Sequence, residues 1–476
     1  MSRRTTTASV FLTLAMVATT AATAATAAPS APAPSADGEP KNVIILIGDG
    51  MGANHVDQAS LYQYGTSYHQ LTRDPATGET TYVPGTPSQV YQDFPVQSWM
   101  STYAANGAAE YDAEAAWADF DWVKQGATDS AAAGTALATG VKTNNGVLGL
   151  DPAGNPVTNL VELAEEAGKA SGVVSSVPFS HATPSAYAVH TASRNSYHEI
   201  ANQMISSGLD VIIGGGHPYY DDDAQQVDPT FTWISEGDFA AVSDFRTDYT
   251  YVEDNRQFAR LAENKPLTGR DYAPGQKRGD QRPEQLFGLV KVKETLQYNR
   301  SGALHGVEPY EVPANEDVPG LDTLSLAALN VLDRNDEGFF LMIEGGAIDW
   351  AGHANTSARN IEETIDFNEA VEATADWVEK NSSWDETLVI VTADHETGYL
   401  AGPGADPLWT EMTGVAGQTP AHGYYSGSHT NMLVPVYAKG AGAEQIAVRS
   451  TLEDPVLGRY LDNTDLAQIQ MELVRR

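Results

Sequence analysis

Ser130 stands directly after an aspartate and before a run of small, alanine-rich residues, within the segment Thr128–Ala136. Small residues of this kind predict the start of a tightly packed, buried helix. The free N–H groups and the positive dipole end of such a helix favour an anion at the serine. Ser130 could therefore accept a phosphoryl group. Taken alone, the segment also fits an ordinary Asp–Ser helix cap with no chemistry attached.

Carboxylates and imidazoles occur elsewhere at spacings that suit metal binding. Asp349 and His353 are four residues apart, so on a helical turn they would face the same way and could bind one ion. Nitrogen and oxygen ligands together suit zinc, whereas Glu344 in the company of hydroxyl and carboxylate groups suits magnesium. Further candidates are Asp49, Asp394, His395 and His429. Taken singly, each of these residues is more often structural than a metal ligand.

The glycines around Asp49, in the segment Gly48–Gly52, are typical of a tight loop. Their spacing is not that of a dinucleotide-binding loop, and a carboxylate in the middle would repel a pyrophosphate. A metal-binding aspartate fits this loop better, with a turn or cap residue as the alternative.

The polar candidates follow apolar, β-rich runs that predict strands buried on both faces. These runs are Asn42–Ile47, Ser171–Val177, Val211–Ile213, Gly338–Ile343 and Thr387–Thr392. Helices are predicted between them, at Thr158–Lys169, Leu324–Leu332 and Ile361–Lys380. The alternation predicts an α/β fold with a large, mostly parallel central sheet and helices on both faces, which brings the strand ends to one edge.

Two long stretches lack this alternation. Tyr62–Trp122 is aromatic and polar and is interpreted as loop-like. Residues 219–319 are hydrophilic and are interpreted as a loop-rich embellishment with short elements of its own, including a strand near Gly288–Val290.

The N-terminus is typical of an export signal. Arg3 and Arg4 precede the apolar run Ala8–Val17, which is too short to span a bilayer, and Ala25–Ala27 offers a small-residue cleavage pattern. We expect a signal peptide at residues 1–27, a flexible Pro/Ala-rich leader at 28–40 and a single catalytic domain at 41–476. The protein is thus expected to be exported, to the periplasm or outside the cell, through either the Sec or the twin-arginine route. No transmembrane segment is expected.

The charge balance is strongly acidic. The 27 Lys and Arg residues against 63 Asp and Glu residues give a net charge of −36, and there is no cysteine. Such a surface disfavours nucleic acid as a partner and fits a saline or marine habitat. An anionic substrate would need local cations that reverse the sign of the charge at the site.

Four motifs together resemble those of the alkaline phosphatases, in family order and across nearly all of the chain after the leader. They are Ile47–Gly52, Thr128–Ala132, Glu344–Asp349 with His353, and Thr392–Gly398. The resemblance implies an alkaline-phosphatase-like fold and hydrolysis of phosphate monoesters through a covalent phosphoserine, with two zinc ions and one magnesium ion. Family members are often homodimers, so a homodimer is expected here, with a monomer as the alternative.

The resemblance also implies a role for each matching residue. Ser130 would be the nucleophile, and Arg194 would clamp phosphoryl oxygens with its bidentate fork. The implied ligands are Asp349, His353 and His429 for the first zinc, Asp49, Asp394 and His395 for the second, and Asp49, Glu344 and Thr183 for magnesium.

Asp129, His181 and Trp350 are expected to contact either the substrate or the side chains that bind the metal ions. Some members have aspartate in place of His181, and others have lysine or histidine in place of Trp350. The His and Trp pair resembles marine bacterial alkaline phosphatases, so magnesium affinity and phosphate release are where this chain is expected to depart from the best-known members.

The residues alone are also compatible with two other functions. The first is a phosphodiesterase or sulfatase of the same superfamily, although a sulfatase would be expected to carry a cysteine-derived nucleophile. The second is a non-catalytic extracytoplasmic protein that binds metal or phosphate.

Overall fold

The computed structural model describes residues 38–107, 110–269, 271 and 282–476. The predicted signal peptide and residues 28–37 of the predicted leader lie outside this range. Among the described residues, no helix is long and apolar enough to cross a membrane.

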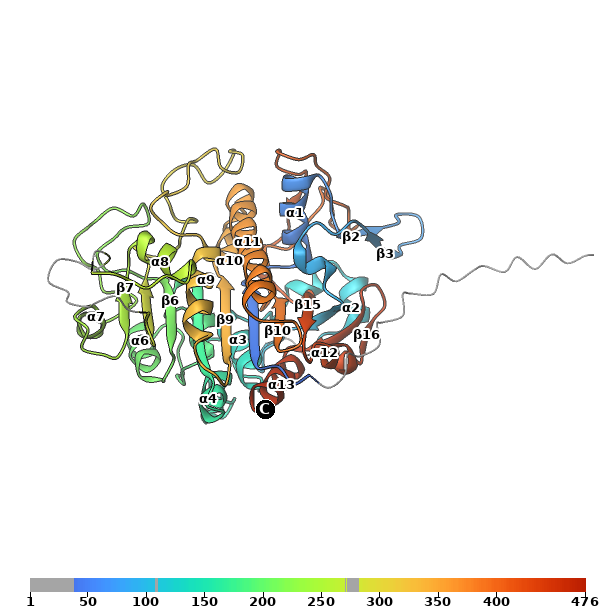
Figure 1. Cartoon of the computed structure of the whole chain (residues 1–476). Helices are drawn as coiled ribbons and strands as arrows, with labels where there is room; N and C mark the ends of the chain where they lie inside the picture. The colour runs from blue at the N-terminus through green and yellow to red at the C-terminus, as the bar shows by residue number, and fades with distance from the viewer. Residues whose placement is uncertain (1–37, 108–109, 270, 272–281) are drawn as a thin grey trace, which may run out of the picture. The chain divides into compact units, whose positions relative to one another are not determined.

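The fold is built around β1 (Asn42–Gly48), whose seven residues are all buried, as a continuous apolar run predicts. It lies in the middle of a sheet that has eleven strands in the described part of the chain (Figure 1), in the order β16-β17-β4-β15-β10-β1-β9-β5-β6-β8-β7. The other strands of this sheet are β4 (Val96–Ser101), β5 (Ala170–Pro178), β6 (Val211–Gly215), β7 (Thr250–Val252), β8 (Leu286–Leu289), β9 (Phe339–Gly345), β10 (Thr387–Thr392), β15 (Val434–Gly440), β16 (Leu452–Asp454) and β17 (Gly458–Asp462).

Most strand pairs in the sheet are parallel. β1 pairs in parallel with both β9 and β10, and β5, β6, β8 and β7 extend the parallel part beyond β9. β15 is antiparallel to β10 and β4, and β16 is antiparallel to β17. The predicted α/β class with a mostly parallel central sheet is therefore confirmed.

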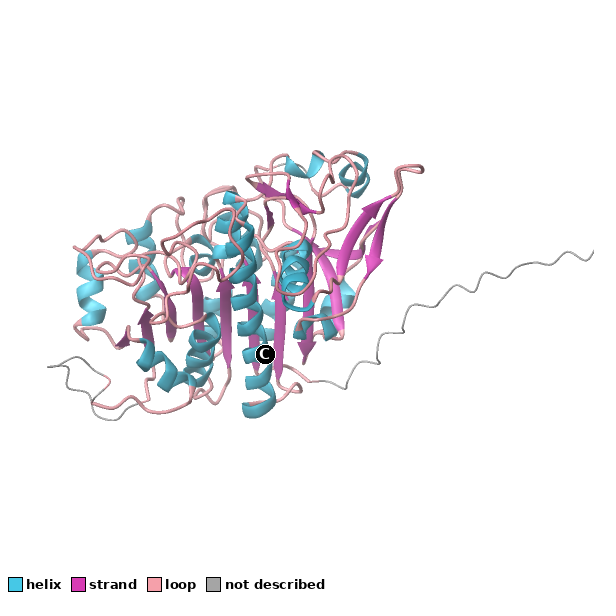
Figure 2. Cartoon of the chain, turned by 90° about the horizontal axis from the view of Figure 1, so that it is seen from above, coloured by secondary structure: helices cyan, strands magenta, loops and turns pink. Residues whose placement is uncertain are grey.

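Helices lie against both faces of the sheet (Figure 2). α9 (Leu321–Leu332) and the 25-residue α11 (Ser357–Asn381) pack together on one face. α3 (Ser130–Thr139), α4 (Leu160–Glu166) and α13 (Asn463–Val474) form a second packed group. The remaining α-helices are α1 (Ala53–Tyr64), α2 (Ala113–Ala118), α5 (Ala182–Ala186), α6 (Tyr197–Ser206), α7 (Glu236–Ser243), α8 (Asn255–Ala262), α10 (Ala347–Ala354) and α12 (Glu444–Arg449).

The loop-like interpretation of Tyr62–Trp122 is wrong. This stretch contributes β4 to the main sheet and forms a separate antiparallel hairpin of β2 (His69–Arg73) and β3 (Thr80–Pro84). Gln97 and Ser98 interrupt the apolar residues of β4, which explains why no buried strand was expected there. Residues 219–319 do contain the strand expected near Gly288, and both β7 and β8 extend the main sheet.

Two short ladders lie beyond the end of β10. β11 (Glu396–Thr397) pairs with β14 (His429–Thr430), and β12 (Leu400–Ala401) pairs with β13 (Gly423–Tyr424). The first of these ladders brings Thr397, close to His395, into register with His429, although the two histidines are 34 positions apart in the sequence.

Candidate active site

The candidate residues gather at the carboxyl ends of four adjacent parallel strands. Register places Ile47 of β1 opposite Glu344 of β9 and opposite Thr392 of β10. Ser175 of β5 lies on the other side of Glu344. Because parallel strands end at one edge of a sheet, the polar residues after β1, β5, β9 and β10 converge there.

Ser130 is the first residue of α3, as the sequence predicts. Asp129 is the N-cap of this helix, and its Oδ1 accepts a hydrogen bond from Ala132 N at 3.0 Å. The Ser130 hydroxyl is buried and lies 3.2 Å from His395 Nε2. The serine is thus held at a helix N-terminus with its oxygen directed at a candidate metal ligand.

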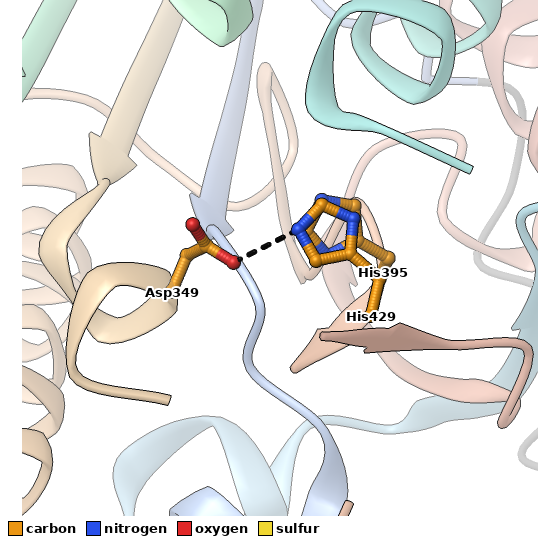
Figure 3. A group of neighbouring side chains, drawn as sticks. All are labelled: Asp349, His395 and His429. Carbon is orange, nitrogen blue, oxygen red and sulfur yellow. Dashed lines mark ion pairs between the residues drawn. The ribbon is translucent and has the colours of Figure 1, made fainter. Parts of the chain in front are cut away.

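Asp349, His353 and His429 come together from α10 and β14. Asp349 Oδ1 lies 3.3 Å from His429 Nε2 (Figure 3). The same oxygen lies 3.4 Å from His353 Nε2. The other ring nitrogens contact backbone carbonyls, with His429 Nδ1 2.7 Å from Thr128 O and His353 Nδ1 2.9 Å from Gly427 O. When each Nδ1 donates to its carbonyl, Nε2 is the ring nitrogen that faces Asp349; it donates to the carboxylate when it is protonated and has a lone pair for a metal ion when it is not.

Asp49, Asp394 and His395 form a second group, which is fully buried. His395 Nε2 lies 3.2 Å from Asp394 Oδ2 and 3.5 Å from Asp49 Oδ1. The His395 ring also stacks on the His429 ring, with centroids 3.6 Å apart. The two groups are therefore neighbours, and His395 also lies within ligand distance of Asp349 and His429.

A third group surrounds Glu344. Ligand atoms of Asp49, His181 and Glu344 lie within 4.8 Å of one another. Thr183 Oγ1 donates to Asp49 Oδ2 at 3.3 Å, and Ser175 donates to Glu344 in a short hydrogen bond. The group is thus richer in oxygen ligands than the other two.

Arg194 connects this third group to Asp129, the residue before Ser130. Its Nη1 donates to Asp129 Oδ2 at 3.0 Å, and its Nη2 lies 3.4 Å from His181 Nε2. Trp350, on α10, contacts the His181 ring edge to face at a centroid distance of 5.7 Å. Every residue singled out in the sequence thus lies in one connected cluster.

The ionisation of the cluster reflects crowded, buried carboxylates. Burial, with the charges of Asp394 and Asp349, raises the pKa of Asp49 well above its usual value. Burial also raises the pKa of Glu344 and of Asp394 to about 7. Burial lowers the pKa of His429, but the hydrogen bond and charge of Asp349 outweigh this effect and raise the pKa to about 9. Negative charge this dense is unfavourable unless cations neutralise it.

The residues fit bound metal ions. Asp49 Oδ1, Asp394 Oδ2, Glu344 Oε1 and His181 Nδ1 are buried and accept or donate no hydrogen bond among the described residues. Buried polar atoms are rarely left without partners, so these atoms mark places that a cation would fill. Carboxylates with imidazoles suit zinc, and the oxygen-rich Glu344 group suits magnesium.

Thr397 is a further residue of the site that was not predicted, although it lies within the motif Thr392–Gly398. The buried Thr397 hydroxyl lies 2.6 Å from Asp349 Oδ1 and 3.3 Å from His395 Nδ1. Its position two residues after His395, at the end of the short strand β11 that follows this histidine, is the signal that could have identified it.

The sequence profile of the family described as alkaline phosphatase matches residues 40–420 of this chain. The chain belongs to the alkaline phosphatase family. The match includes every candidate residue of the cluster except His429. The family uses metal ions, in keeping with the three ligand groups at the sheet edge.

Individual relatives have low sequence identity to this chain but align with most of its length. The chain is 30% identical to the alkaline phosphatase of Escherichia coli K12, over 76% of this chain and 71% of that protein. It is 29% identical to alkaline phosphatase 4 of Bacillus subtilis, over 78% of this chain and 65% of that protein. The chain thus matches just under two thirds of the length of that Bacillus protein.

The fold is also that of solved alkaline phosphatases. The structure of a cold-active alkaline phosphatase from a psychrophilic Shewanella species superposes with a TM-score of 0.61. The alignment covers 91% of this chain and all of that one, at 24% sequence identity.

Proposed function

We propose that this protein is an alkaline phosphatase that hydrolyses phosphate monoesters through a covalent phosphoserine. The observation that carries the proposal is the buried Ser130 hydroxyl at the start of α3, 3.2 Å from His395, with Arg194 paired to the preceding residue, Asp129. Membership of the alkaline phosphatase family supports the same conclusion.

In the proposed reaction, Ser130 Oγ attacks the phosphorus of the ester and the ester oxygen leaves as an alcohol. Water then attacks the phosphoserine, releasing inorganic phosphate and restoring the hydroxyl. The N–H groups at the start of α3 face the negative charge that collects on the phosphoryl group. Arg194 has a planar fork of donors, which suits binding of two phosphoryl oxygens.

Arg194 is already oriented for this task by Asp129, which accepts from Nη1. Its other terminal nitrogen, Nη2, lies near His181 and faces the third ligand group. Phosphoryl transfer depends mainly on alignment and charge stabilisation, so an arginine held in place before the substrate binds favours the reaction.

Asp349, His353 and His429 would hold one zinc ion, and Asp49, Asp394 and His395 a second. Asp49, Glu344 and Thr183 would hold magnesium, with His181 nearby. When bound, such ions supply positive charge that stabilises the attacking and leaving oxygens and lowers the pKa of serine and water. Buried cations together with Arg194 would also resolve how a chain of net charge −36 attracts an anionic ester.

Export to the periplasm or beyond the cell, by the signal peptide at residues 1–27, is part of the proposal, as is a homodimer. Both follow from the sequence pattern and the family resemblance.

The test is hydrolysis of p-nitrophenyl phosphate at alkaline pH by the parent protein and by Ser130→Ala. Each is measured with zinc and magnesium and again after chelation. The matched control is Ser325→Ala. Ser325 is also buried, in α9, and within the described part of the chain its hydroxyl bonds only to Leu321 O, at 2.7 Å.

Turnover that disappears on chelation and in Ser130→Ala, but persists in Ser325→Ala, is the expected result. Robust turnover by Ser130→Ala would contradict the phosphoserine route. Faster hydrolysis of bis-p-nitrophenyl phosphate or p-nitrophenyl sulfate would instead identify a diesterase or sulfatase, and no turnover of any ester would favour a binding protein.

A further inference from the structure

The hydroxyl of Thr397 joins two ligand groups that the proposed mechanism treats separately. Its Oγ1 lies 2.6 Å from Asp349 Oδ1, in the first zinc group, and 3.3 Å from His395 Nδ1, in the second. Thr397 is fully buried, so no solvent competes for these contacts.

The directions of these hydrogen bonds follow from the groups involved. An ionised carboxylate can only accept, so the Thr397 hydroxyl hydrogen must point to Asp349. The same oxygen can then only accept from His395, which requires the hydrogen of the neutral imidazole to be on Nδ1. This leaves a lone pair on Nε2, the atom 3.2 Å from both Ser130 Oγ and Asp394 Oδ2.

His395 differs in this respect from the two other candidate histidine ligands. His353 Nδ1 and His429 Nδ1 each contact a backbone carbonyl, which no substitution removes. The orientation and tautomer of His395 depend instead on a side-chain hydroxyl.

The backbone holds Thr397 firmly in this position. Thr397 N donates to Gly50 O at 3.0 Å, and its register partner in the β11–β14 ladder is His429. A Cβ at position 50 would come within 2.7 Å of Thr397 Oγ1, so the glycine there leaves room for the hydroxyl.

We propose that Thr397 is a positioning residue that couples the two zinc groups, orienting Asp349 and holding His395 in the tautomer whose Nε2 can bind metal. This inference rests on the metal-dependent function proposed above. Groups that orient metal ligands in this way typically change metal affinity by about 10–100-fold when they are removed.

The test compares Thr397→Val, which keeps the branched shape but lacks the hydroxyl, with Thr397→Ser, which keeps the hydroxyl. The apoproteins are titrated with zinc against a chromogenic chelator. The imidazole ¹⁵N signals of the histidines are recorded in the same samples to report the tautomer of His395. Thr397→Ala serves as a second variant if valine prevents folding, which circular dichroism checks.

The control is Thr392→Val. Thr392 is as buried as Thr397 and donates at 2.9 Å to Pro435 O, but its hydroxyl touches no candidate ligand. Thr392→Val therefore loses a comparable hydrogen bond without disturbing the zinc groups.

We expect Thr397→Val to bind zinc about 10–100-fold more weakly and to lose the Nδ1–H signal of His395. Thr397→Ser and Thr392→Val should match the parent protein. Unchanged zinc affinity in Thr397→Val, or equal weakening in Thr397→Ser, would overturn the inference. Failure of the parent to hydrolyse p-nitrophenyl phosphate would overturn the proposed function instead, because the zinc titration does not depend on turnover.

Discussion

Asp129 holds Arg194 with one carboxylate oxygen and caps α3 with the other. Oδ2 accepts from Arg194 Nη1 at 3.0 Å, and Oδ1 accepts from Ala132 N at 3.0 Å. One side chain thus fixes both the helix that begins at Ser130 and the arginine proposed to bind the phosphoryl group. These two roles can be separated by substitution.

Asp129→Ala should destabilise the protein by about 1 kcal/mol, because the N-cap of α3 is lost. Asp129→Asn should cost much less, since asparagine caps helices about as well as aspartate. Both variants remove the charge opposite Arg194, so both should change the KM for p-nitrophenyl phosphate. Thermal unfolding and steady-state kinetics separate the two effects, and equal stability loss in both variants would contradict the capping role.

Removal of metal should destabilise the protein strongly. The carboxylates of Asp49, Asp394 and Glu344 are fully buried, and without cations they repel one another. At free metal about 1,000-fold above the dissociation constant, loss of binding corresponds to roughly 4 kcal/mol. The midpoint of thermal unfolding should therefore fall after chelation and recover when zinc and magnesium are added back.

Ser130→Ala is the informative partner in that measurement. It retains every candidate ligand, so chelation should lower its unfolding midpoint as much as that of the parent. A midpoint that does not respond to chelation in either protein would contradict metal binding at the sheet edge.

A buried ion-pair network joins α11 to the segment before α9. Glu362 Oε2 lies 2.7 Å from Arg300 Nη2 and 3.1 Å from Arg359 Nη1, and all three side chains are almost completely buried. Glu362→Ala would leave two buried guanidinium groups without their shared partner. We expect a loss of about 3–5 kcal/mol in the free energy of unfolding, measured by denaturant titration.

Lys380→Ala provides the comparison. Lys380 pairs with Asp376 at 2.8 Å on the same helix, but both side chains are more than half exposed. This substitution should cost no more than about 0.5 kcal/mol. Similar losses in the two variants would mean that burial does not govern these ion pairs.

Asp366 should make stability depend on pH. Burial, together with the charges of Asp322 and Glu369, raises its pKa from 3.8 to about 7. A carboxyl group with a raised folded-state pKa stabilises the fold when it is protonated. This contribution is complete below about pH 4 and is lost as the pH rises through about 7.

Asp366→Asn removes this titration and keeps an oxygen that can accept from Leu321 N. It should stabilise the protein by roughly 2 kcal/mol at alkaline pH, about half of the full shift because the side chain is partly exposed. The gain should vanish near pH 4. Thermal unfolding across this range checks the prediction, with the exposed Asp376→Asn as control; a gain independent of pH would count against it.

The central strands could be predicted from the sequence because each is a continuous apolar run that ends in a polar residue. β1 and β10 are examples, since Asp49 follows β1 directly and Asp394 comes two residues after the end of β10. β4 could not be predicted in this way, because Gln97 is exposed and Trp99 is only partly buried within it. Its membership of the sheet depends on pairing with β15 and β17, which lie more than 300 residues later.

Contacts between distant segments also limit what the sequence predicts about the site. Its residue types and strand-end positions are visible in the sequence, but the contact between Thr397 and Asp349 depends on how β11 turns back toward α10. Similarly, Trp233 from the hydrophilic stretch lies 6.2 Å, centroid to centroid, from the His181 ring, a contact that hydropathy does not indicate.

The central place of β1 has a consequence for how the polypeptide acquires its structure. β1 is the first strand to be synthesised, but its two sheet neighbours begin only at residues 339 and 387. During synthesis, almost 300 residues must therefore follow this largely apolar segment before either of its edges can be paired. Long-range pairing of this kind is slow and leaves strand edges open to aggregation. The edges of β1 thus stay unpaired until the C-terminal third of the chain has been made, and the complete ligand set exists only after His429 has joined it.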